Sequence, residues 1–241
     1  GLEVIRHNLN RQIHRLSLFE FGRSYISSGD GCEEAEKLCL YFTGNTNGES
    51  WIASERPTDF YYAKGIAEAV LGKLGLSNLQ TDDSNDNRLQ YGLEWRRGNR
   101  NLLIMGRVKP TLLKQMEIKQ EVFFAEFEWA NILEAYGKAR VKVKEVAKFP
   151  AVRRDLALVL NEQIQFSEIA ALISKRAGDK LNSVNLFDVY RGEKIDQGKK
   201  SYAVSLIFQD REKTLNDKDI DKLIGKIISQ LSEKFGADIR K

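Results

Sequence analysis

The chain has 241 residues, of which 42% are hydrophobic and 30% are charged, and its net charge is +4 at pH 7. This balance is typical of a globular protein with one large domain or two ordinary ones, and it excludes a disordered or fibrous chain. The longest apolar runs span five residues, which excludes a transmembrane helix. With no signal-peptide pattern either, we expect a cytoplasmic protein.

The residue types that usually carry catalysis or bind metals are scarce. The histidines are His7 and His14, and neither a zinc-spaced cluster nor a nucleophile motif stands near them. Cys32 and Cys39 are too few for a disulfide framework, so we expect free thiols in a reducing compartment. Residues 81–88 resemble the start of a calcium loop but lack its glycine and its later glutamate. We therefore expect no catalytic, cofactor or metal site in this chain.

The first part of the chain predicts a mixture of helices and strands. After a helix-like opening segment, a second helix follows Pro57, with Thr58 or Asp59 as its cap and Gly75 as its end. Residues 76–100 are polar and rich in turn residues. Strands are predicted at residues 18–22, 101–108 and 121–129.

A domain boundary is predicted near residues 140–150. There the alternating basic segment 141–144 has the character of an edge strand and leads to Pro150. We therefore divide the chain into domains at residues 1–146 and 147–241.

The second domain predicts six elements in the order βαββαβ, the ferredoxin-like layout. Its first helix is capped by Ser167 and ends at Gly178, and its second opens at Asn216 and ends at Gly236. The predicted strands lie at residues 154–160, 181–190, 200–208 and 237–241. The chain is thus expected to be an α+β protein, with a mixed or antiparallel sheet domain preceding this one.

In a ferredoxin-like domain both helices cover one face of the sheet and leave the other face open. Alternation along the strands predicts which side chains face each way. If the helices cover Phe187 with Val189 and Val204 with Leu206, then Asp188, Tyr190 and Ser201 point to the open face. Tyr190 could then stack a nucleobase, with phosphates held at the rim by Arg191, Lys199 and Lys200. The alternative is that this face packs on another domain and that Tyr190 fills the interface.

Five segments of the second domain form an ordered series: Phe149-Pro150-Ala151-Val152-Arg153-Arg154-Asp155-Leu156-Ala157, Leu186-Phe187-Asp188-Val189-Tyr190-Arg191-Gly192, Gly198-Lys199-Lys200-Ser201-Tyr202-Ala203, Thr214-Leu215 and Ile239-Arg240. This series resembles the ferredoxin-fold anticodon-binding domain that closes the beta subunit of bacterial phenylalanyl-tRNA synthetases.

A second series, in the first domain, resembles the adjoining region of the same subunit, which is a class II synthetase-like fold without an active site. Its segments are Asn8-Leu9-Asn10-Arg11-Gln12, Leu18-Phe19-Glu20-Phe21-Gly22-Arg23, Glu55-Arg56-Pro57-Thr58-Asp59-Phe60, Lys64-Gly65 and Gly106-Arg107-Val108-Lys109-Pro110. The chain departs from the family at residues 89–97, where a His-Pro-Gly-Arg-like segment is usual.

The resemblance implies a non-catalytic C-terminal piece of a longer subunit, and the missing initiator methionine agrees with that. The implied holoenzyme is a phenylalanine–tRNA ligase whose alpha subunit uses ATP and Mg²⁺ in an (αβ)₂ assembly. The implied partners are this alpha subunit and phenylalanine tRNA, with neither DNA nor a membrane. Arg11, Arg15 and Arg23 are then expected at the surface or at a subunit interface rather than on ATP.

For the second domain, the resemblance implies that the first anticodon base stacks on Tyr190. Asp188 and Ser201 would hydrogen-bond base edges, and Arg191, Lys199 and Lys200 would contact phosphates. Arg154 and Asp155 could also lie near the RNA. Alternatively, they form an internal ion pair that fixes the first strand. The local charge agrees, since residues 145–241 carry +3 (18 basic and 15 acidic) of the total of +4.

Two other functions stay open from the sequence. Ferredoxin-like domains also serve as small-molecule sensors, although the stretch 161–166 lacks the glycine of a typical ligand loop. The open sheet face could also serve only for dimerisation.

Overall fold

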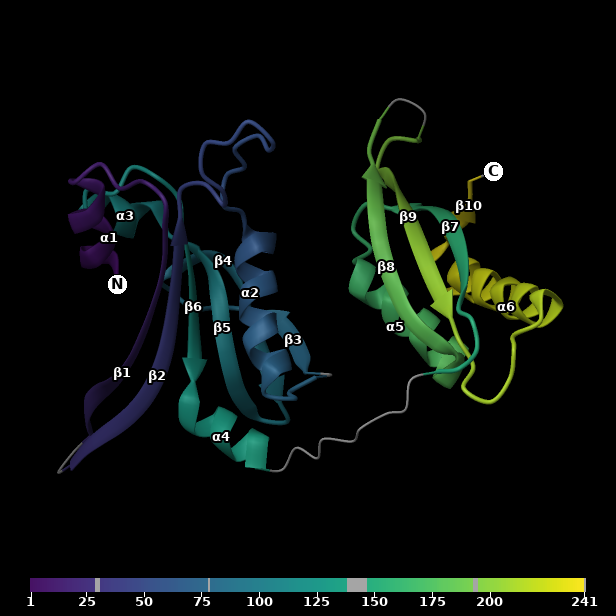
Figure 1. Cartoon of the computed structure of the whole chain (residues 1–241), viewed down its shortest axis with the longest axis horizontal. Helices are drawn as coiled ribbons and strands as arrows, with labels where there is room; N and C mark the ends of the chain where they lie inside the picture. The colour runs from purple at the N-terminus through teal and green to yellow at the C-terminus, as the bar shows by residue number, and fades with distance from the viewer. Residues whose placement is uncertain (29–30, 78, 138–146, 193–194, 241) are drawn as a thin grey trace. The chain divides into compact units, whose positions relative to one another are not determined.

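The computed structural model describes residues 1–28, 31–77, 79–137, 147–192 and 195–240. The chain divides into two compact units, Gly1–Lys142 and Val143–Lys241 (Figure 1). The predicted strand at residues 141–144 lies outside the described residues. Each unit contains one antiparallel sheet with helices against it, as expected for an α+β protein.

The first unit is built on a six-stranded sheet in the order β1-β2-β6-β5-β4-β3. Its strands are β1 (Leu16–Ser28), β2 (Gly31–Thr43), β3 (Gln80–Asp83), β4 (Leu89–Arg97), β5 (Arg100–Val108) and β6 (Val122–Glu128). Its helices are α1 (Leu2–Leu9), α2 (Phe60–Lys73), α3 (Pro110–Gln115) and α4 (Trp129–Gly137). All pairings between neighbouring strands are antiparallel.

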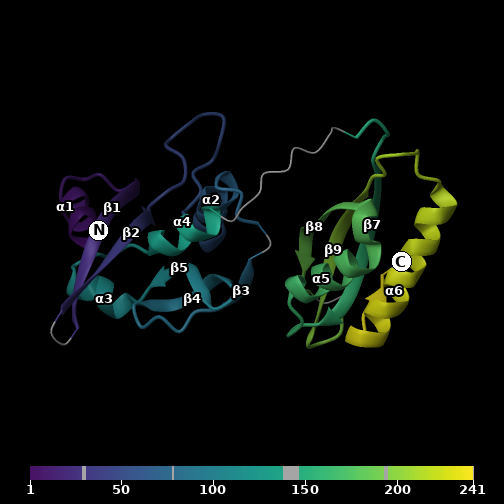
Figure 2. The same ribbon diagram turned by 90° about the horizontal axis from the view of Figure 1, so that it is seen from below.

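Hydrophobic clusters cover both faces of this sheet. Helices α2 and α4 pack on one face, where Phe123 and Phe127 of β6 meet Ala67 and Ile132, and Figure 2 shows both helices on the same side of β4 and β5. On the other face, α1 and α3 pack against β6 through Ile5 and Leu113. The alternation of β6 explains this, because its odd-numbered residues face α2 and α4 and its even-numbered residues face the opposite way.

A charge network interrupts the second of these faces. Arg88 donates two hydrogen bonds of 3.0 Å to the Glu126 carboxylate and others to Asp86. Lys37 donates to Glu126 at 3.1 Å and to Glu128 at 2.8 Å. Glu126 is only 7% exposed, and burial alone would raise its pKa, but hydrogen bonds and charges from Arg88 and Lys37 outweigh this and lower it. The buried carboxylate therefore depends on its cationic partners.

Several predictions for this unit need correction. The polar, turn-rich residues 76–100 contain the strands β3 and β4. Their polar character reflects an exposed edge strand, β3, and a strand, β4, on which Glu94 and Arg96 pair with each other. The sequence analysis also missed β2, α3 and α4. The helix after Pro57 is confirmed, and Asp59 is its cap, accepting a 2.7 Å hydrogen bond from the Tyr62 amide.

The second unit has the predicted βαββαβ layout. Its strands are β7 (Val152–Asn161), β8 (Leu181–Tyr190), β9 (Lys199–Phe208) and β10 (Asp238–Ile239), in the sheet order β10-β7-β9-β8. Helices α5 (Phe166–Ala177) and α6 (Asp217–Phe235) cover one face, and a 3-10 turn, η1 (Gly178–Lys180), leads into β8. Their side chains form one core with alternate residues of β7 and β9.

The helix boundaries of this unit follow local signals. Asn216 caps α6 by accepting a hydrogen bond from the Lys218 amide, and Gly236 ends it in the left-handed conformation at φ 60°. Helix α5 instead begins one residue before the predicted cap, with Gln165 and Glu168 forming a capping box. Ser167 is thus a first-turn residue and not the cap.

No helix in the described ranges is long and apolar enough to cross a membrane. No group of three or more histidine, cysteine or acidic residues with the geometry of a metal site occurs in the same ranges.

Candidate nucleic-acid interface

The face of the second sheet that lies away from α5 and α6 carries the candidate site. Strand pairing sets the rows across this face, because residues directly opposite each other point the same way. Tyr190 of β8 lies opposite Ser201 of β9, which lies opposite Val159 of β7. The next row holds Asp188, Ala203 and Ala157. Small side chains therefore form the floor, and Tyr190 stands at its β8 edge.

The predicted facing of β9 agrees with the structure, but that of β8 is wrong at Phe187. Val204 and Leu206 are fully buried beneath the helices. In β8, a β-bulge between Leu186 and Asp188 inserts one residue into the register. Leu186 packs on the helix-side core, whereas Phe187 is 51% exposed. Val189, opposite the buried Tyr202, is on the helix side but is 39% exposed at the sheet edge.

The Tyr190 ring has two close neighbours, Arg240 and Gly192. The guanidinium carbon of Arg240 lies 5.4 Å from the centre of its ring, within the range of a cation–π contact. The Arg240 amide donates to the Ala157 carbonyl at 2.9 Å, which fixes the chain beyond β10. The tip of the ring also approaches Gly192, where a Cβ atom would lie 2.5 Å from the Tyr190 hydroxyl oxygen. The ring position thus requires glycine at residue 192.

The predicted hydrogen-bonding residues lie beside this ring. Asp188 is exposed on the same strand, two positions before Tyr190. Ser201 is 5% exposed and belongs to the floor of the face, so a ligand must reach down to it. These two side chains offer a carboxylate acceptor and a hydroxyl that can donate or accept.

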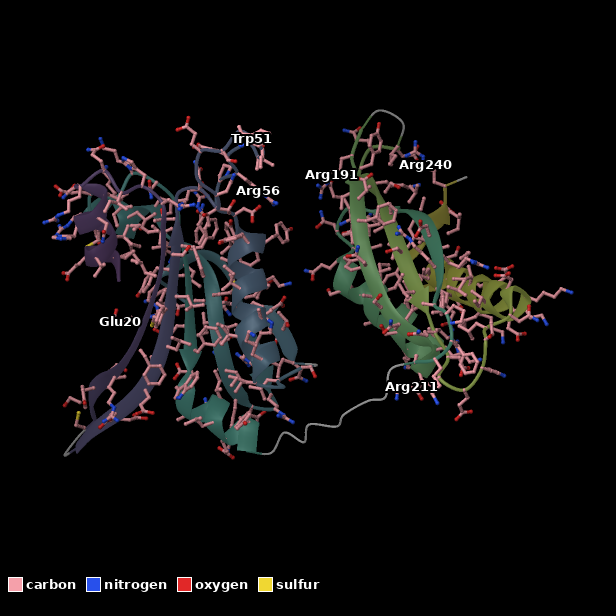
Figure 3. All side chains as sticks on the ribbon, viewed as in Figure 1. Glu20, Trp51, Arg56, Arg191, Arg211 and Arg240 are labelled. Atoms are coloured by element: carbon pink, nitrogen blue, oxygen red, sulfur yellow. The ribbon has the colours of Figure 1, made fainter. Side chains whose placement is uncertain are left out.

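Two of the predicted phosphate contacts lie at the rim, each paired with a carboxylate. Arg191 donates to Glu162 at 3.0 Å, and Lys199 donates to Asp196 at 3.0 Å. Asp196 raises the pKa of Lys199 through this hydrogen bond and its charge. Figure 3 shows Arg191 and Arg240 at the same end of the unit. Because exposed ion pairs are worth only about 0–1 kcal/mol, both cations can exchange their partner for a phosphate.

Lys200 does not join this group. It lies opposite Leu160, on the helix side of the sheet, and is 5% exposed. Its ammonium donates to the Glu162 carbonyl at 2.7 Å and lies 4.6 Å from the centre of the Tyr202 ring. Adjacent strand residues point to opposite faces, so Lys199 and Lys200 cannot share a phosphate site.

The internal ion pair between Arg154 and Asp155, an alternative that the sequence left open, does not form, for the same geometric reason. Arg154 points toward the helices and pairs with Asp217 and Asp221 of α6. Asp155 points to the open face and accepts from the Arg153 Nε at 2.8 Å. Arg154 and Asp155 therefore lie on opposite faces of the sheet.

The arginines of the first unit that could be taken for ATP ligands do not converge. Arg11 and Arg15 are exposed, and Arg11 donates to the His7 carbonyl of its own turn. Arg23 pairs with Glu34 and Glu36 across the β1–β2 hairpin. Their side chains are therefore at the surface, as expected.

Sequence reasoning missed two residues of this face, Arg240 and Phe187. Arg240 was noted only as part of a terminal motif, since its contact with Tyr190 joins residues 50 positions apart. Phe187 was assigned to the helix side because strict alternation does not anticipate a bulge.

Comparison with known proteins gives two family matches. The family described as "Phenylalanyl tRNA synthetase beta chain CLM domain" matches residues 1–129, more than half of the chain. The "Ferredoxin-fold anticodon binding domain" matches residues 147–240.

Individual relatives agree with these matches. Proteins named phenylalanine–tRNA ligase beta subunit match over the whole chain, with 38% identity in Bacteroides thetaiotaomicron and 35% in Porphyromonas gingivalis. The chain spans 31% of the length of these curated relatives. Among solved structures, pyrrolysyl-tRNA synthetase from Desulfitobacterium hafniense gives a TM-score of 0.42 at 16% identity, covering 57% of this chain and 48% of its own. This structural similarity is too weak to support a conclusion about the chain.

Proposed function

The chain belongs to the phenylalanyl-tRNA synthetase beta chain family, and on that premise we propose that its second unit binds the anticodon stem-loop of phenylalanine tRNA. The RNA lies on the open sheet face, and one anticodon base stacks on Tyr190. The observation that carries this proposal is the Tyr190 ring, fixed beside Gly192 and Arg240 above a floor of small side chains. Aromatic rings on an open sheet face, with cations around them, suit unpaired bases and their phosphates.

The polar residues take definite roles in this arrangement. Asp188 and Ser201 hydrogen-bond base edges, and Arg191 and Lys199 exchange their carboxylate partners for phosphates. Arg240 either moves off the Tyr190 ring or covers the far side of the stacked base. Lys200 has no part in RNA binding, because its ammonium is occupied on the helix side.

The first unit has a supporting role in the proposed enzyme. It serves as a non-catalytic scaffold for the alpha subunit, which joins phenylalanine to tRNA with ATP and Mg²⁺ in an (αβ)₂ assembly in the cytoplasm. In support, Arg23 is committed to Glu34 and Glu36, while Arg11 and Arg15 are exposed. The scaffold domain is proposed to span residues 1–146, and the RNA-binding domain residues 147–241.

The proposal is tested by titrating the chain with a fluorescently labelled anticodon stem-loop RNA of phenylalanine tRNA. We expect saturable binding that weakens with salt, because Arg191 and Lys199 together neutralise two phosphates, which corresponds to a log–log slope of about −1.4. Lys199→Met should weaken binding and reduce the slope, whereas its neighbour Lys200→Met should bind as the parent does. Equal affinity for an unrelated hairpin, or no binding, would contradict the proposal.

Substitution of Gly192 probes the placement of the Tyr190 ring without removing it. Gly192→Ala puts a methyl group 2.5 Å from the tyrosine hydroxyl oxygen, so the ring must move away. We expect stem-loop affinity to fall about threefold to tenfold, less than the loss of the ring itself. Both residues are outside the core, so thermal unfolding should change little. Unchanged affinity would show that the ring position is not used.

A further inference from the structure

The β-bulge in β8 places a second aromatic ring on the open face. Phe187 is 51% exposed, although Val184 and Leu186 of the same strand pack on the core. The Arg153 guanidinium carbon lies 5.5 Å from the centre of the Phe187 ring. Arg153 lies opposite Ile207 on the face that carries Ala157 and Ser201, so this ring contact places Phe187 on the open side.

Folding of the unit does not explain this exposed ring. An unbulged strand would bury alternate residues, as β9 does with Tyr202, Val204 and Leu206. The bulge instead leaves one residue of the ladder unpaired and turns a large apolar side chain toward solvent. Such features often re-aim a side chain for binding.

The pair formed by Phe187 and Arg153 repeats the chemistry of Tyr190 and Arg240. Each pair has an aromatic ring on β8 and a guanidinium that reaches it from β7 or from the chain beyond β10. The two rings are attached three residues apart, about 10 Å along the strand. A stacked strand rises ~3.4 Å per nucleotide, so this separation corresponds to about three stacked bases. Between the two attachment points, the row opposite Asp188 consists of Ala203 and Ala157.

We propose that Phe187 and Arg153 form a second stacking site, which takes a nucleobase of the same RNA loop about three bases from the one on Tyr190. This inference rests on the proposed function, since it assigns another nucleotide of the anticodon loop to the same face. The ring supplies a stacking surface that accepts any base, and the guanidinium covers the base or holds the adjoining phosphate.

The charges around Phe187 allow Arg153 to contact a stacked base or its phosphate. Arg153 engages Asp155 through its Nε, and within the described residues no hydrogen bond is recorded for its two terminal nitrogens. Its side chain is 56% exposed, so the guanidinium can move as a base enters. Asp155 keeps the arginine oriented over the sheet and also repels phosphate from its own side.

The test measures stem-loop binding by the intact chain and by Phe187→Ala, with Val189→Ala as the matched control. Val189 is on the same strand, is partly exposed and faces the helix side. We expect Phe187→Ala to bind about fivefold to tenfold more weakly, and Val189→Ala to bind as the parent does. Urea unfolding of each variant confirms that the unit remains folded.

Single abasic sites placed through the RNA loop then locate the contact. With the base missing at one loop position, the parent and Phe187→Ala should have the same affinity for the RNA. With the base missing at another position, the parent and Tyr190→Ala should have the same affinity. Parent-like binding by Phe187→Ala, or an equal loss with every abasic RNA, would overturn the second site. If Phe187→Ala binds as the parent does while Tyr190→Ala binds more weakly, only the second stacking site is contradicted. If the parent chain binds no stem-loop, the proposed function fails with it.

Discussion

We expect the substitution Arg88→Met to lower the free energy of unfolding of the first unit by about 2–3 kcal/mol, a typical value for hydrogen bonds to a buried charge. The change removes two 3.0 Å hydrogen bonds from the Glu126 carboxylate, which is 7% exposed and, among the described residues, keeps Lys37 as its remaining cationic partner. It also removes the contact of the guanidinium with the Phe124 ring. All three tryptophans, at residues 51, 95 and 129, belong to this unit. Urea unfolding followed by tryptophan fluorescence therefore reports on it alone.

Arg23→Met is the matched control for this experiment. Arg23 also bridges two glutamates, but on the exposed β1–β2 hairpin, so its loss should lower the stability much less than that of Arg88 does. The double variant Arg88→Met with Glu126→Leu should regain much of the loss, because no buried carboxylate is left unpaired. Equal effects of Arg88→Met and Arg23→Met would contradict this interpretation of the network.

The same network predicts a dependence on pH. The folded-state pKa of Glu126 lies below its usual value of 4.5, so its stabilising contribution is present above pH 4.5 and is lost as the pH falls further. The difference between the parent and Arg88→Met should therefore shrink as the pH is lowered through this range. A difference that stays constant would assign the loss to the Phe124 contact instead.

The second large effect is expected for Tyr190→Ala, which should weaken stem-loop binding by about 1–3 kcal/mol, or roughly fivefold to 150-fold. The substitution removes the ring on which the base stacks, and with it the surface that Arg240 covers. Tyr190→Phe keeps the ring and loses only the hydroxyl, so it should stay within about twofold of the parent. Fluorescence anisotropy with the labelled stem-loop measures both.

A result in which Tyr190→Phe is as weak as Tyr190→Ala would mean that the hydroxyl and not the ring face makes the contact. The tyrosine lies at the end of β8, partly exposed and outside the buried core. Neither variant is therefore expected to unfold the unit.

Local signals in the sequence were enough to predict most of the second unit. Asn216 and Gly236 bound α6, and strict alternation in β9 separates Tyr202, Val204 and Leu206 from the open face. Alternation failed at Phe187, because a bulge changes the register without leaving a composition signal. Arg240 was not paired with Tyr190 for a related reason, since only the folded sheet brings the Arg240 side chain from beside β7 to the Tyr190 ring.

The first unit was harder to predict because its strands carry charges. Gln80–Asp83 forms an exposed edge strand, and β4 alternates apolar residues with Glu94 and Arg96, which pair with each other. From the sequence these residues are only polar and rich in turn residues, so no strand was predicted there. Likewise, Lys37, Arg88 and Glu126 come from distant segments, so their network could not be inferred before the sheet order was known.

The location of the RNA is tested most directly by the tyrosine ring signals of the second unit. This unit has two tyrosines, Tyr190 on the open face and Tyr202 beneath the helices, so each reports on one face. In a chain with isotope-labelled tyrosine rings, addition of the stem-loop RNA should shift the NMR signals of Tyr190, through the ring current of the stacked base, and leave those of Tyr202 unchanged. Assignment follows from Tyr190→Phe. Saturable binding that shifts Tyr202, or that leaves Tyr190 unchanged, would contradict anticodon recognition on the open face.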